Sequence, residues 1–130
     1  MDNNEQSVIE QEFLKSWDQI EEFYEVMSEF EPQIEWFKQK ALTLISQMRE
    51  RGYDRQLRAG QIVWSLILSR SRKHGLSEGQ MRLLIHFKKD GGMFVTYGDA
   101  HENPKTMIDS EILSPELESF LRQLLAHPID

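Results

Sequence analysis

The sequence predicts an α+β fold: an N-terminal helical hairpin plus a central buried helix, then a three-stranded antiparallel meander and a C-terminal helix. Two observations predict it. Apolar residues recur every three or four positions through the first 48 residues, and from Met81 onward they alternate with polar residues. We expect a single domain, residues 1–130, with the helical part over about 7–75 and the meander and final helix over about 80–127.

The first two helices are predicted by an apolar stripe that continues past Pro32. One helix over residues 7–49 would be about 60 Å long, whereas a compact chain of this length has a radius of gyration near ~14 Å. A hairpin broken near Pro32 therefore fits a monomer. The alternative is one kinked helix that forms a homodimer through the N-terminal helices. The stripe consists of Phe13, Trp17, Ile20, Tyr24, Met27, Phe30, Ile34, Phe37, Ala41, Leu44 and Met48.

A third helix is predicted over residues 55–74, after a helix end at Gly52. Its centre, "IVWSLIL", is apolar nearly all round, which is typical of a buried helix. The same residues are good strand formers, so periodicity alone leaves both possibilities open. Lys73 in the last turn, followed by Gly75, is typical of a helix C-terminus and favours the helix.

Strand alternation begins at Met81 and places Leu83, Ile85 and Phe87 on the same face as Met81. Arg82, Leu84, His86 and Lys88 fall on the opposite face. "KDGG" predicts a hairpin turn, "MFVTY" the returning strand and "KTMID" a third strand at an edge. "SPELESFLRQLLAHP" predicts the final helix, with a serine cap followed by proline in its first turn.

Charge is distributed unevenly along a chain whose formal net charge is -7. Residues 1–48 carry a net -8, residues 49–89 a net +7, and residues 90–130 a net -6. We predict that the basic block forms one partner-binding face. The alternative is that the acidic first helix neutralises this block internally. The predicted face consists of Arg70, Arg72, Lys73, Arg82, His86 and Lys88.

No catalytic constellation is recognisable in the sequence. It contains no cysteine, no phosphate-binding glycine motif and no spaced histidine pair. Asp99, His101 and Glu102 share one loop and are potential metal ligands, but a turn is the favoured interpretation of such a loop. We therefore predict no cofactor, no metal site and no enzymatic activity.

The function predicted from these features is a non-catalytic protein-interaction module: a small acidic adaptor, inhibitor or chaperone-like protein that uses its basic face. The expected partner is another protein with an acidic surface. One alternative is a nucleic-acid-binding regulatory protein, disfavoured because the acidic flanks repel phosphate; a second is an enzyme with an unrecognised site. The acidic N-terminus and the short apolar runs predict a cytoplasmic protein without a membrane segment.

Overall fold

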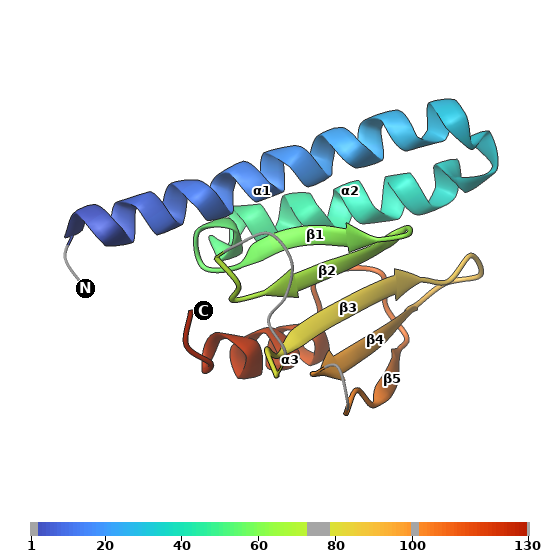
Figure 1. Ribbon diagram of the computed structural model, residues 1–130. Coiled ribbons are helices and arrows are strands. Elements are labelled where there is room, and N and C mark those ends of the chain that lie inside the picture. Colours follow the sequence, from blue (N-terminus) through green and yellow to red (C-terminus); the bar gives the residue numbers. More distant parts are fainter. Residues whose placement is uncertain (1–2, 73–78, 100–101, 130) are drawn as a thin grey trace.

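The computed structural model describes residues 3–72, 79–99 and 102–129. The N-terminal half contains α1 (Asn3–Phe30), the short 3₁₀ helix η1 (Pro32–Ile34) and α2 (Glu35–Glu50). Pro32 occupies the first turn of η1, where its missing N–H costs nothing. The chain reverses there, and α2 runs back beside α1 (Figure 1). The predicted helical hairpin is confirmed.

The predicted third helix is wrong, because the chain forms a β-hairpin in its place. The 3₁₀ helix η2 (Tyr53–Arg55) leads into β1 (Arg58–Ile62), which pairs antiparallel with β2 (Ser65–Ser69). All five residues of β2 are buried, so the strand lacks the alternation that distinguishes a strand from a helix. Of the predicted helix C-terminus, residues 73–75 lie outside the described residues.

The turn between β1 and β2 explains why this hairpin is difficult to predict. Val63 adopts a positive φ of 55°, a conformation that β-branched residues rarely take. Tight hairpin turns usually place glycine or asparagine there. Here the helical hairpin holds the turn: the Tyr24 hydroxyl donates to the Trp64 carbonyl at 2.6 Å, and the Phe37 ring lies 6.4 Å from the Trp64 ring.

The rest of the sheet follows the predicted meander. It contains β3 (Arg82–Phe87), β4 (Met93–Gly98) and β5 (Lys105–Ile108), and the complete antiparallel order is β1-β2-β3-β4-β5. The sheet thus has five strands rather than the predicted three, with β5 at one edge. The final helix, α3 (Pro115–Leu125), begins as predicted: the Ser114 hydroxyl accepts a hydrogen bond from the Leu117 amide at 3.3 Å.

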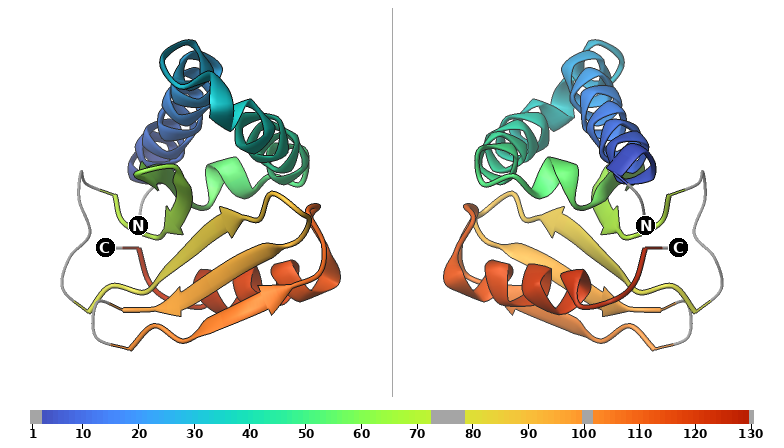
Figure 2. Two further views of the ribbon diagram at one scale, coloured as in Figure 1. Left: turned by 90° about the vertical axis from the view of Figure 1, so that its right-hand side faces the viewer. Right: turned by 90° about the vertical axis from the view of Figure 1, so that its left-hand side faces the viewer.

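The helices cover one face of the sheet and one of its edges. α3 lies against one face of β3–β5, here called the inner face, where Leu83, Ile85 and Val95 are fully buried (Figure 2). The opposite, outer face of these three strands is covered by no helix of the described residues. Lys40 of α2 forms an ion pair of 2.6 Å with Glu111, which lies in the segment between β5 and α3. The apolar side chains of all three helices and the inner face form one core.

α1 runs along the free edge of β1. The Ser16 hydroxyl accepts the Ala59 amide at 3.0 Å, and the Trp17 indole N–H donates to the Leu57 carbonyl at 2.8 Å. These bonds satisfy backbone groups that an edge strand would otherwise leave open. In the described part of the chain, no helix combines the length and apolar character needed to cross a membrane.

Candidate functional site

The candidate site is the outer face of the sheet, where the strand registers align basic and apolar side chains. Leu84 of β3 lies opposite Thr96 of β4, which lies opposite Lys105 of β5. His86 is similarly aligned with Phe94 and Met107. Because side chains alternate between faces, Arg82 and Lys88 share this face with Leu84 and His86. The structure therefore brings together three of the six residues of the predicted face.

Lysine side chains lie over an aromatic ring at the centre of this face. The Lys105 ammonium is 4.1 Å from the centroid of the Phe94 ring, and that of Lys88 is 5.6 Å away. Lys105 was missing from the predicted face, although its place in an alternating edge strand was visible in the sequence. We call the group of exposed Lys105 and partly exposed Arg82 and Lys88 around Leu84 and Phe94 the cationic face. The strand positions of this face contain no acidic residue.

His86 contributes little positive charge to the cationic face at neutral pH. Burial lowers the pKa of its imidazole, and the positive charge of Lys105 lowers it further. The ring shares a hydrogen bond of 2.8 Å with the Ser65 hydroxyl and lies 5.1 Å from the Phe37 ring. This histidine therefore connects the sheet to α2.

Arg70 and Arg72 lie apart from the cationic face and bind other parts of the chain. Arg72 donates two hydrogen bonds to the Glu12 carboxylate, at 2.8 and 3.2 Å. These bonds lower the pKa of Glu12. Arg70 donates to the backbone carbonyls of His127 and Gln56, at 3.0 and 2.9 Å. Lys73, the remaining residue of the predicted face, lies outside the described residues.

α1 neutralises a second arginine of the basic block. The Arg49 guanidinium pairs with Asp18 at 3.0 Å, with Glu21, and with Asp54 at 3.0 Å. Two of these three acids belong to α1. Internal neutralisation therefore accounts for Arg49 and Arg72, whereas the side chain of Arg82 makes no hydrogen bond or ion pair among the described residues.

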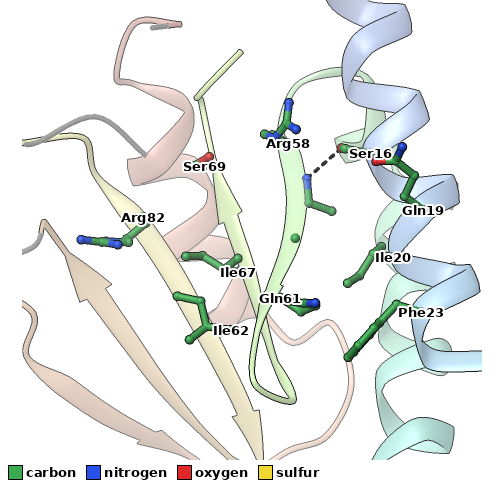
Figure 3. Close-up of a pocket in the computed structure, with 12 residues that line it drawn as sticks. Ser16, Gln19, Ile20, Phe23, Arg58, Gln61, Ile62, Ile67, Ser69 and Arg82 are labelled. Carbon is green, nitrogen blue, oxygen red and sulfur yellow. Dashed lines mark hydrogen bonds between the residues drawn. The ribbon is translucent and has the colours of Figure 1, made fainter. Parts of the chain in front are cut away.

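A cavity of about 450 Å³ opens on the outer face between α1 and the β1–β2 hairpin (Figure 3). Side chains of α1 form one wall, and the strands form the floor and the other wall. A smaller hollow of about 200 Å³ continues toward β4, and Ile62 and Arg82 line both. The apolar lining comes mainly from Ile20, Phe23, Ile62 and Ile67, and the polar lining from Ser16, Gln19, Arg58, Gln61, Ser69 and Arg82.

The loop that contains Asp99 and Glu102 has the geometry of a turn. The Asp99 side chain accepts the Glu102 amide at 2.7 Å, and the Asp99 amide donates back to the Glu102 carbonyl at 3.0 Å. The same carbonyl oxygen lies 1.7 Å from where a Cβ of residue 98 would be, so this turn requires Gly98. His101 lies outside the described residues, and the described ones contain no cluster of three potential metal ligands.

Comparison of the chain with protein-family models, with curated proteins and with solved structures gives no match.

Proposed function

We propose that this protein is a non-catalytic interaction module that binds an acidic segment of a partner protein on its cationic face. The observation that carries the proposal is the composition of that face. Three cations surround half-buried Leu84 and Phe94 on a sheet surface that no helix of the described residues covers. Lys88 forms an ion pair with Asp90 at 3.7 Å, whereas the side chains of Arg82 and Lys105 have no acidic partner among the described residues. Such a mixture of apolar area and positive charge complements a partner that presents acidic and apolar side chains.

The pairing of the other arginines supports this choice of surface. Arg49 and Arg72 are neutralised by acids of the same chain, so their charge is already used within the fold. Arg82 and Lys105 have no acidic partner among the described residues. A protein that needs these cations only for its own stability would gain by placing an acid between them.

A protein partner fits better than nucleic acid. The solvent-exposed side of α1, which is acidic, flanks the sheet. Its negative charge would repel a phosphate backbone that approaches the cationic face. A protein segment carrying only a few carboxylates meets less of this repulsion, and its apolar side chains can cover Phe94 and Met107.

The test is affinity capture with the wild-type protein, Lys105→Glu and the matched control Lys15→Glu. Lys105 and Lys15 are both exposed, but Lys15 lies on α1, away from the cationic face. We expect an acid-rich protein to be captured by the wild type and the control, and to be lost with Lys105→Glu. Raising the salt from about 0.05 to about 0.3 M should weaken the capture, because salt shortens the range of exposed charge interactions.

Two results would contradict the proposal. One is recovery of the same proteins, at the same salt, by wild type and Lys105→Glu. The other is retention of a labelled oligonucleotide that depends on Lys105, which would favour the nucleic-acid alternative. The melting temperatures of both variants should stay close to that of the wild type, since exposed substitutions usually change stability by about 0.5 kcal/mol or less.

A further inference from the structure

The cavity beside α1 has a size and shape suited to a small molecule. Its volume of about 450 Å³ falls within the range of roughly 300–1,000 Å³ that is typical of small-ligand sites. Ile20 and Phe23 line it from α1, and Ile62 and Ile67 line it from the hairpin (Figure 3). The cavity lies at the β1 end of the outer face, and Lys105 and Phe94 do not line it.

The backbone conformation at Gly60, in the floor of the cavity, does not require glycine. Its φ is not among the positive values that favour glycine. A Cβ built at this position would meet only the Ile67 Cγ2 atom, at 3.4 Å, which is an ordinary contact. Glycine inside a strand weakens it and often marks a bulge, a tight bend, or a place where a ligand or another backbone approaches closely; the β1–β2 register is unbroken at Gly60, which leaves out the bulge. The missing side chain therefore keeps the floor open at a cost to the strand.

The charged residues that line the cavity itself are both basic, and Asp99 lines the adjoining smaller hollow. Arg58 and Arg82 line the cavity, and none of the residues that line it is acidic. Arg58 donates a hydrogen bond to the Arg72 carbonyl at 3.0 Å and has a further interaction, whereas the side chain of Arg82 makes no hydrogen bond among the described residues. Arginine binds carboxylates through paired, charge-assisted hydrogen bonds. The apolar walls suit the rest of such a ligand.

We propose that this cavity binds a small organic acid with an apolar body. The carboxylate binds Arg82, which lies beyond Ile67 on the β3 side of the cavity (Figure 3), and the apolar body lies over Gly60 between Phe23 and Ile67. This site goes beyond the proposed protein-binding function, because it uses the α1 side of the outer face and a different class of ligand. Arg82 alone belongs to both surfaces.

The first test is an NMR titration of the ¹⁵N-labelled protein with 4-phenylbutyrate, and in parallel with its uncharged amide, 4-phenylbutyramide. We expect saturable shifts of the backbone amides of Gly60, Gln61 and Ile67 at millimolar 4-phenylbutyrate. The amide should bind about tenfold more weakly, since it lacks the charge-assisted bond to Arg82. Equal affinity for both probes, or shifts that do not saturate, would overturn the proposal.

Variants locate the site and separate it from the cationic face. Gly60→Val should fill the floor and weaken 4-phenylbutyrate binding by about tenfold or more while keeping or raising the melting temperature, because valine favours strands. Arg82→Gln should weaken it about tenfold, and Arg55→Gln, at an exposed position of η2, should leave it unchanged. Should Gly60→Val fail to fold, Arg82→Gln and Arg55→Gln still decide the result.

Unchanged binding by Gly60→Val or by Arg82→Gln would overturn the proposal. Lys105→Glu distinguishes the two sites: it should abolish partner capture and leave the affinity for 4-phenylbutyrate unchanged. If capture persists in Lys105→Glu while Gly60→Val loses the probe, only the proposed protein-binding function fails. If capture is lost and the probe never binds, only the small-ligand site fails.

Discussion

Tyr24→Phe tests how the helical hairpin holds the β1–β2 turn. The ring of Tyr24 is fully buried in the core, and its hydroxyl donates to the Trp64 carbonyl at 2.6 Å. Burial also raises the pKa of this hydroxyl, so it stays protonated and able to donate. The substitution removes one oxygen, keeps the ring and leaves a carbonyl without its donor. Leaving an interior acceptor unpaired costs about 1–3 kcal/mol, and the upper part of this range does not apply because this bond is partly buried.

We therefore expect Tyr24→Phe to lower the free energy of unfolding by about 1–2 kcal/mol, or the melting temperature by about 4–8 °C. Urea unfolding followed by tryptophan fluorescence measures it. Tyr97→Phe is the matched control, because the Tyr97 hydroxyl meets the His127 ring at 3.2 Å where the tyrosine is only half-buried. Water can replace that bond, so the control should change stability by about 0.5 kcal/mol or less. Equal losses in the two variants would refute the role given to Tyr24.

Two further predictions concern charge. Arg72→Glu should lower the melting temperature, because it places a third acid beside Glu5 and Glu12. Adding Glu12→Arg to this variant should restore part of the melting temperature. Strictly additive effects of the two substitutions would contradict the ion pair between residues 12 and 72. Because the pKa of His86 is lowered from 6.5 in the folded protein, the unfolded chain takes up its proton first as pH falls. Urea unfolding should show that the free energy of unfolding decreases as the pH is lowered from about 7 to about 5. His86→Gln should make this decrease smaller, and an equal decrease in His86→Gln would exclude His86 as its source.

The sequence predicted those elements whose local signals agree with their tertiary environment. The strand alternation around Leu83 and Ile85 survives because only the inner face is buried. The cap at Ser114 and the reversal at Pro32 follow from local backbone chemistry, which needs no information about distant residues. These elements lie where they were predicted.

The β1–β2 hairpin was missed because its determinants are distant in sequence. Its turn carries Val63 where glycine or asparagine would signal a hairpin, and the stabilising contacts come from Tyr24 and Phe37 of the helices. β2 is buried along its whole length, so its apolar run has no strand period. The strand-forming residues at the centre of the predicted helix and Gly60 inside it were the signals against a helix.

The candidate site could be predicted only in part for a related reason. Arg82 and Lys88 were placed on one face by their strand period, and the register that adds Lys105 depends on pairing across β4. Sequence proximity grouped Arg70 and Arg72 with them, because both were assigned to a helix that does not form. The partner of Arg72, Glu12, lies 60 positions away along the chain.

Site-directed photo-crosslinking in cells measures most directly whether the cationic face binds a protein. The photoreactive residue p-benzoylphenylalanine is introduced in place of Met107, which is 53% exposed beside Phe94 and Lys105, or in place of Val8, which is 49% exposed on α1. We expect a crosslink to an acid-rich protein from position 107 that disappears when Lys105→Glu is added, and no such crosslink from position 8. Crosslinks from position 8 alone, or crosslinks from position 107 that persist in Lys105→Glu, would contradict this expectation.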